Sequence, residues 1–140
     1  MSDNIHFEIV TPVSAVYSGE ATSVILPSQR GEVEILPGHR AMLSLIQHGT
    51  VVVTEVGGAK KVLVVEPGYV ETVDNKVTLL VAGCLHSADV DVEASRADVL
   101  KGEKVLQAPD LLTEEQLAEE RNRYERARAR VAMVERATKG

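Results

Sequence analysis

The C-terminal segment of the chain carries the side chains best suited to binding an anion. Arg123, Arg126 and Arg130 recur in a stretch rich in Ala and Glu, and Arg126 and Arg130 are four positions apart. On a helix this spacing places both guanidinium groups on one face, with Arg123 one turn earlier on the same side. Such groups can bind a triphosphate or an acidic segment of a partner protein. A solvated charged face, partly neutralised by the acidic residues 114–120, accounts for the same pattern equally well.

Side chains that catalyse reactions or bind metals are sparse. His6, His39, His48 and His86 form neither an HxH nor an HExxH pattern, and Cys84 is the single cysteine. We therefore expect no thiolate zinc site and no disulfide within the chain, and we interpret Cys84 as a small buried residue at the end of a strand. The sequence contains no G-x-S-x-G elbow and no GxxxxGK[ST] loop. It thus predicts no catalytic residue, no metal site and no required cofactor.

Composition narrows the classes of partner. The chain has 140 residues, 44% of them hydrophobic but only 3% aromatic, with no Trp and a formal net charge of -6. Few aromatic side chains make base stacking implausible, and the negative charge opposes binding to phosphate backbones or anionic lipid. No apolar stretch approaches the ~20 residues that a membrane-spanning helix needs, and no apolar signal core follows the N-terminal Met-Ser-Asp-Asn. Any association with a membrane must then be through a partner.

The N-terminal part of the chain reads as β-structure. Ile5, Phe7 and Ile9 alternate with polar positions, and the pairs 57–58 and 74–75 (Gly-Gly and Asp-Asn) suit two-residue turns with positive φ. We predict an all-β sandwich or flattened barrel of about ten short strands and assign residues 1–86 to it. Strands are expected near residues 5–10, 13–18, 22–26, 32–36, 41–47, 51–56, 59–65, 69–73 and 76–82.

Residues 87–140 predict a C-terminal α-helical hairpin, because Ala, Glu and Arg at helical spacing replace Gly, Pro and β-branched residues. Asp89 or Asp91 can cap a first helix that extends to about Gln107. Its apolar stripe is expected at Ala94, Ala97, Leu100 and Val105. Gly102 is expected to weaken this helix by roughly 1 kcal/mol relative to Ala.

A second helix is expected after Ala-Pro-Asp at residues 108–110, which ends the first. Thr113 and Gln116 form a capping box for it. Its apolar seam is predicted at Leu117, Tyr124, Ala127, Val131 and Val134. Two short helices with thin apolar seams are marginal alone, so this hairpin needs a surface to lie on and is predicted to be a movable element.

Residues 31–39, Gly-Glu-Val-Glu-Ile-Leu-Pro-Gly-His, resemble the signature loop of the epsilon subunit of bacterial-type F-type ATP synthases. The resemblance extends over almost the whole chain. It includes Val-Tyr-Ser-Gly-Glu-Ala at 16–21, Val-Ile-Leu-Pro at 24–27, Leu-Ile-Gln-His-Gly at 45–49, Arg-Ala at 96–97 and the Arg-rich last helix.

The resemblance implies a β module whose loop tip contacts the polar loops of the membrane rotor ring, the c-ring. Carried over by position, Glu32 and His39 are the contact residues. This chain has Glu34 where the family usually has Gly. The implied partners are the gamma subunit, the c-ring and the alpha and beta catalytic subunits, with no nucleic acid.

Some members of this family bind ATP between the β module and the helical hairpin. They use an (I/L)DxxRA segment in the first helix and two arginines four apart in the second. Here Val92-Glu93-Ala94-Ser95-Arg96-Ala97 occupies the first position, with Glu93 in place of the usual Asp. The resemblance therefore implies Glu93, Arg96, Ala97, Arg126 and Arg130 as an ATP-binding set, with ATP as a regulatory ligand.

The function implied is that of a non-catalytic coupling subunit in the central rotor stalk. It would help join the gamma subunit to the c-ring at the cytoplasmic face of the bacterial plasma membrane, and its helices would inhibit ATP hydrolysis. The alternative from another class is a free-standing β-sandwich metal-dependent enzyme or ligand-binding domain with a helical dimerisation tail.

Overall fold

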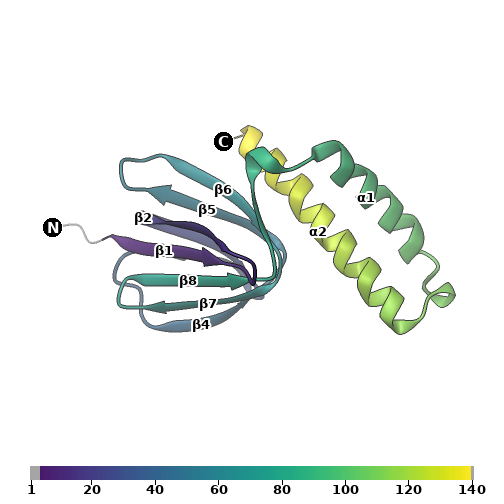
Figure 1. Ribbon diagram of the computed structural model, residues 1–140, viewed down its shortest axis with the longest axis horizontal. Coiled ribbons are helices and arrows are strands. Elements are labelled where there is room, and N and C mark those ends of the chain that lie inside the picture. Colours follow the sequence, from purple (N-terminus) through teal and green to yellow (C-terminus); the bar gives the residue numbers. More distant parts are fainter. Residues whose placement is uncertain (1–3, 140) are drawn as a thin grey trace.

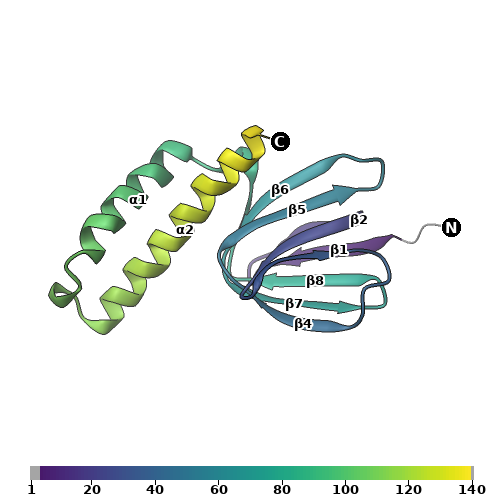
Figure 2. The same ribbon diagram turned by 180° about the vertical axis from the view of Figure 1, so that it is seen from behind.

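The computed structural model of the protein describes the backbone of residues 4–139 and the side chains of residues 4–135. Two parts are visible, a β module and a helical hairpin that extends from one end of it (Figure 1). The same arrangement is seen from behind in Figure 2. The side chains of Arg136 and Lys139, which add to the basic character of the last helix in the sequence, lie outside the described residues.

Within residues 4–139, nine strands build the β module, close to the predicted number. They are β1 (Ile5–Val10), β2 (Ala15–Ser28), β3 (Gly31–Ile35), β4 (Met42–Ile46), β5 (Gly49–Glu55), β6 (Lys60–Val65), β7 (Gly68–Val73), β8 (Lys76–Val81) and β9 (Cys84–His86). The strand order is β1-β8-β7-β4-β2-β5-β6-β9, with β3 on β2 and a further pairing of β1 with β2 that closes part of the network into a ring. The result is the expected sandwich or flattened barrel.

Two strand predictions need correction. Residues 13–18 and 22–26 were expected as separate strands, but β2 is continuous over Ala15–Ser28. Its first half pairs with β1 and its second half with β3 and β5, with an irregular register between Ala21 and Ser23. A bulge therefore lets one strand serve both layers where the sequence suggested a break.

The second correction concerns Cys84. This residue begins the short strand β9, which pairs with the end of β6, rather than ending a strand. Its side chain is only half-buried, yet burial is enough to raise the thiol pKa to about 11.

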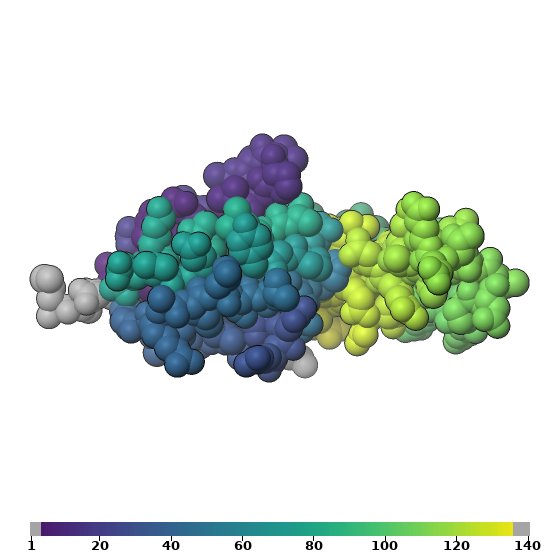
Figure 3. All heavy atoms as spheres, turned by 90° about the horizontal axis from the view of Figure 1, so that it is seen from below, coloured from purple at the N-terminus to yellow at the C-terminus, as the bar shows by residue number. Residues whose placement is uncertain are grey.

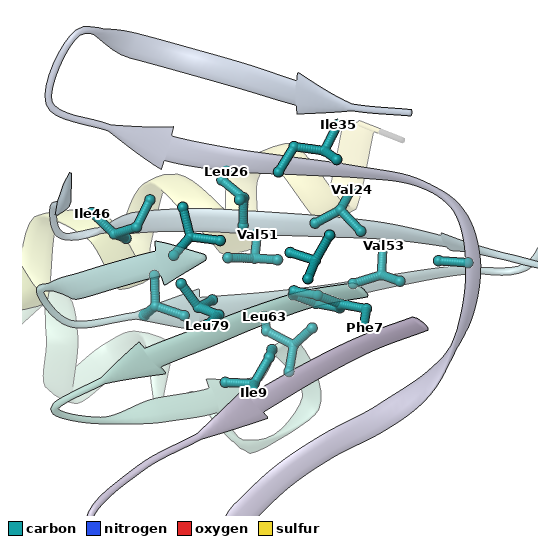
Figure 4. Packing of buried hydrophobic residues seen from close by; sticks show 14 of the residues in the cluster. Phe7, Ile9, Val24, Leu26, Ile35, Ile46, Val51, Val53, Leu63 and Leu79 are labelled. Carbon is teal, nitrogen blue, oxygen red and sulfur yellow. The ribbon is translucent and has the colours of Figure 1, made fainter. Parts of the chain in front are cut away.

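Hydrophobic side chains from both layers, nearly all of them aliphatic, fill the space between the strands. Figure 4 shows Phe7, Leu26 and Leu79 among them, and all three are fully buried. Phe7 contacts Tyr17, with ring centroids 5.8 Å apart. Two of the four aromatic residues of the chain thus lie together at one place in an otherwise aliphatic core.

The predicted turns have the expected backbone. Gly57 and Gly58 have φ of 102° and 98°, and Asp74 and Asn75 have φ of 49° and 62°. Positive φ at both central residues gives a hairpin turn whose twist matches that of the strands.

The hairpin comprises α1 (Val92–Leu106) and α2 (Glu114–Lys139), joined through the 3-10 turn η2 (Pro109–Leu111). Another 3-10 turn, η1 (Ser87–Asp89), links β9 to α1. Asp91 caps α1 by accepting the Ala94 N–H at 3.0 Å. The capping box is confirmed, because the Thr113 N–H donates to Gln116 and the Gln116 N–H donates back to the Thr113 hydroxyl.

The predicted apolar stripe of α1 is wrong. Ala94, Ala97 and Leu100 are exposed, whereas Ser95 and Gly102 are buried. A Cβ atom built on Gly102 would lie 2.7 Å from Cδ1 of Tyr124. Gly102 is therefore a contact point between the helices rather than a simple weakness in α1, and the absence of its side chain allows close approach.

The surface that the hairpin needs is the outer face of β5 and β6. α2 contacts both strands, and Figure 3 shows the two helices continuing the molecule beyond the β module. Ala127 and Met133 of α2 are buried, as are Val52 of β5 and Val64 of β6, whose side chains point away from the sandwich core. The burial of Met133, Val52 and Val64, together with the contacts of α2 with both strands, ties the C-terminal half of α2 to the β module.

Candidate functional site

The β module presents two functionally distinct ends. At one end lie the loop 36–41 and the β5–β6 and β7–β8 turns; at the other, β4, β6 and β8 end and the helices pack (Figure 1). The strand register supports this division, since Met42 pairs with Thr72 near the first end and Ile46 with Gly68 near the second. We call the loop 36–41 the tip loop.

The tip loop follows β3, on which Glu32 and Glu34 are exposed while Ile35 is buried, as the alternation in the sequence predicted. His39 was expected to be an exposed turn residue, but it is half-buried, and its Nδ1 donates to the Arg40 carbonyl at 2.8 Å. Its main-chain N–H donates to the Leu36 carbonyl at 3.1 Å. The local chain thus orients the ring, leaving Nε2 as the atom available to a partner.

The hairpin is fastened to the opposite end by an ion pair. Nη1 of Arg126 on α2 donates to Oε1 of Glu66, in the turn between β6 and β7, at 3.3 Å. The two side chains are 34% and 21% exposed. Glu66 packs so closely on Gly83 that a Cβ there would overlap its carboxylate, and the Glu66 N–H donates to the Gly83 carbonyl. Gly83 thus fixes the main chain of Glu66 and leaves room for its carboxylate, which is placed where Arg126 can pair with it.

A second polar contact lies beside it. Nε2 of His48 donates to Oδ1 of Asn122 at 2.9 Å, and Nδ1 of His48 is buried without a hydrogen-bond partner among the described residues. We call the pairs Glu66–Arg126 and His48–Asn122 the clasp. A hollow of about 400 Å3 opens next to His48, between the start of β5 and the helices.

The residues predicted to bind ATP are only partly brought together. Gly102 faces Tyr124, so Arg96, six residues before Gly102, and Arg130, six after Tyr124, lie at the same level of the antiparallel hairpin. Arg126 is occupied by Glu66. Neither Arg96 nor Arg130 forms an ion pair with any of the described residues.

The remaining members of that set lie on α1. Glu93 and Ala97 are exposed, and within the described part of the chain Glu93 forms no ion pair with Arg96. The hollow beside His48 is not lined by any of the five residues predicted for ATP.

One candidate surface was missed by sequence reasoning. The outer face of β4 and β7 exposes Leu43, Leu45 and Tyr69, which are 70%, 56% and 44% exposed. Leu45 pairs directly with Tyr69, so the three form a continuous apolar patch. The signal in the sequence is the run Met-Leu-Ser-Leu-Ile at 42–46, in which both faces carry large apolar residues, so that alternation alone does not reveal which one is exposed.

A charged cluster lies on the outer face of β1 and β2. His6 lies between Glu8 and Glu20, with ring nitrogens 3.1 Å from each carboxylate. The hydrogen bond to Glu8, followed by that to Glu20, raises the pKa of His6 above its ordinary value of 6.5. In the described part of the chain, no group of three or more His, Cys, Asp or Glu side chains is arranged to hold a metal ion.

Tyr17 donates its hydroxyl to Glu55 at 2.6 Å. Burial, and then this bond, raise the tyrosine pKa.

Within residues 4–139, neither helix is both long and apolar enough to cross a membrane.

Comparison with known proteins gives a consistent result. Residues 4–87 match the family described as the β-sandwich domain of the ATP synthase Delta/Epsilon chain. The ATP synthase epsilon chain of Campylobacter fetus is 36% identical over 104 residues, which are 74% of this chain and 80% of the relative. The epsilon chain of Bordetella avium is 34% identical over 102 residues, covering 73% of this chain and 72% of the relative.

Solved structures share the fold. A chain in the cryo-EM structure of the Euglena gracilis mitochondrial ATP synthase, comprising OSCP, F1 and the c-ring, superposes with a TM-score of 0.80. The match covers 98% of this chain and 82% of that chain at 16% sequence identity. A chain of the Tetrahymena thermophila mitochondrial ATP synthase central stalk and c-ring gives a TM-score of 0.62, also at 16% identity.

Proposed function

The chain belongs to the ATP synthase epsilon chain family, and from this premise we propose that it joins the gamma subunit to the c-ring in the central rotor stalk. Membership makes it a subunit of the complex, peripheral to the membrane, rather than a catalytic enzyme on its own. The comparisons do not support the alternative of a free-standing metal-dependent enzyme. We place the subunit at the cytoplasmic face of a bacterial plasma membrane.

The observation that carries this proposal is the separation of the two ends. The tip loop, with His39, lies at one end, and the clasped hairpin lies at the other, with the β module between them. Glu32 is not in the tip loop: it pairs with Pro27 near the start of β3, toward the hairpin end. A sandwich closed by the β1–β2 pairing resists shear, as torque transmission requires. The tip loop is suited to contact polar loops of the ring, and the hairpin is suited to move without disturbing that contact.

The gamma subunit is proposed to cover the apolar patch of Leu43, Leu45 and Tyr69. This patch lies along the side of the module, between the two ends, where a chain running along the stalk axis would pack. Large exposed leucines suit a permanent subunit interface better than contact with water.

The hairpin is proposed to act as a brake. The structure has the helices folded back on β5 and β6. Release of the clasp would free α2 to extend along the gamma subunit toward the alpha and beta subunits. There its arginines would meet acidic residues and suppress ATP hydrolysis.

ATP is proposed as a ligand that favours the folded-back hairpin. In support, Arg96 and Arg130 lie at the same level, and neither pairs with a carboxylate among the described residues. Arg126 would have to leave Glu66 to reach a phosphate, so Glu66 and nucleotide compete for one guanidinium group. Glu93, on α1 with Arg96, would orient that arginine once the site forms.

The stalk proposal is tested by combining Glu32→Lys with His39→Asp in the assembled enzyme. Proton-driven ATP synthesis should fall relative to proton flow, because the family resemblance assigns both residues to the ring contact, although only His39 lies in the tip loop. Glu71→Lys, an exposed charge reversal on β7 at the residue that pairs with Leu43, probes the surface proposed for the gamma subunit instead. Full coupling in the tip-loop variant would show that the ring contact lies elsewhere.

A further inference from the structure

We infer that Asn75 is the positioning residue that holds the tip loop in place for the ring contact, an inference that rests on the proposed function of that loop. Oδ1 of Asn75 accepts the main-chain N–H of Gly38 at 2.7 Å. Asn75 lies in the β7–β8 turn, far from Gly38 in the sequence. The contact therefore joins two elements that the sequence keeps apart.

The tip loop has little else to hold it. Residues 36–41 fall between the last paired residue of β3, Ile35, and the first of β4, Met42. Within the described part of the chain, the other hydrogen bonds of this loop are local, from His39 to Leu36 and to Arg40. Gly38 has φ of 85°, and a Cβ built there would meet nothing within 4 Å. Side-chain packing thus does not fix this glycine, and the bond from Asn75 does.

Asn75 is itself rigidly held. Its main-chain carbonyl accepts the N–H of His6 at 2.8 Å, where β1 runs parallel to β8 and His6 pairs with Lys76. Its backbone sits in a two-residue turn with φ of 62°. The residue thereby connects the tip loop to β1 and β8, and a force on the loop passes into two central strands instead of bending the loop.

The residue type fits this role. Asn tolerates the left-handed backbone that the turn requires and also carries a carbonyl oxygen that accepts a hydrogen bond. Gly would tolerate the backbone but lacks the oxygen. Asp keeps both properties. Comparison of Asn, Gly and Asp at position 75 therefore distinguishes the effect of the turn backbone from the effect of the hydrogen bond to Gly38.

The first measurement is amide hydrogen exchange at Gly38 by NMR in the full-length subunit. Asn75→Gly should speed exchange at Gly38 about fivefold, the effect expected for loss of one hydrogen bond. Asn75→Asp should retain the protection. Asp74→Gly, a matched change at the neighbouring turn position, should leave Gly38 unchanged, because the Asp74 side chain makes no hydrogen bond among the described residues. Unchanged exchange in Asn75→Gly would overturn the inference.

The second measurement places the same variants in the assembled enzyme. ATP synthesis relative to proton flow should fall in Asn75→Gly and recover in Asn75→Asp. Full coupling in Asn75→Gly, while the Glu32→Lys, His39→Asp variant is uncoupled, would refute a positioning role. If that double variant also stays fully coupled, the ring contact is wrong, and faster exchange at Gly38 would still support Asn75 as the anchor of the loop.

Discussion

Removal of the charge on Glu66 should weaken the attachment of the hairpin to the β module. Glu66→Gln keeps the shape of the side chain beside Gly83 but eliminates its charge, so Arg126 loses an ion pair and retains at most a neutral hydrogen bond. The change should shift the equilibrium from folded-back toward extended helices. In the assembled enzyme, the extended brake should lower ATP hydrolysis.

The magnitude follows from the exposure of the pair. Arg126 and Glu66 are 34% and 21% exposed, so solvent screens their attraction and the pair contributes about 0.5 to 1 kcal/mol. The extended population should then rise about two- to fivefold. Burial of Met133 on α2 and of Val52 and Val64 on the facing strands remains, so the hairpin should stay mostly folded back.

The assay is a distance measurement between spin labels at Val13→Cys and Leu111→Cys. These positions are 93% and 84% exposed, one in the β module and one at the far end of the hairpin. The native Cys84 should interfere little, because burial raises its thiol pKa to about 11 and keeps it protonated at neutral pH.

The control is Glu103→Gln, which removes one carboxylate from an exposed position of α1 that forms no ion pair among the described residues. Its distance distribution should match that of the parent protein. Added salt should reduce the difference in distance distribution between the parent protein and Glu66→Gln, since salt screens the partly exposed ion pair of Glu66 and Arg126. Identical distributions for the parent and Glu66→Gln, or an equal shift in Glu103→Gln, would refute the assignment of the clasp.

Four further predictions follow from the same structure. Gly102→Ala should lower the free energy of unfolding of the hairpin by about 1 to 3 kcal/mol, because the new methyl group would overlap Tyr124. A higher free energy of unfolding, measured by circular dichroism, would mean that helix propensity outweighs packing. The pKa of His6 is raised in the folded state, so its contribution to stability is complete below pH 6.5 and is lost as the pH rises through the folded-state pKa; denaturant titrations at several pH values should show this loss, and His6→Gln should remove it. Calorimetry should detect weak ATP binding that Arg126→Ala and Arg130→Ala reduce and Glu66→Gln strengthens, because the competitor for Arg126 is removed; no heat at millimolar ATP would assign these arginines to the acidic partner surface. Truncation after Ser87 keeps β9 paired with β6, so the β module should fold and assemble and ATP hydrolysis should be faster; unchanged hydrolysis would remove the inhibitory role of the helices.

Features set by neighbouring residues could be predicted from the sequence. Positive φ at Asp74 and Asn75, alternation along β1 and the capping box of Thr113 and Gln116 all depend on residues within one turn or one strand. Local chemistry decides these features before the chain is compact. The family resemblance, carried by residues 31–39, also needed no coordinates.

Features that join distant segments depended on the tertiary structure. β2 is continuous because its two halves find partners in different layers, although the sequence predicted separate strands at residues 13–18 and 22–26. Gly102 became a packing position only because Tyr124 lies against it. Neither fact is contained in the spacing of apolar residues along one helix or one strand.

The contacts proposed to control function are of this second kind. Glu66 meets Arg126 and Asn75 meets Gly38 across long separations in the sequence. Residue types alone showed that arginines and a Pro-Gly-His loop were present, and resemblance suggested their roles. Only the packing of α2 on β5 and β6, and of the tip loop on the β7–β8 turn, decided which side chains hold them, because a hydrogen bond forms only where folding brings donor and acceptor within about 3 Å.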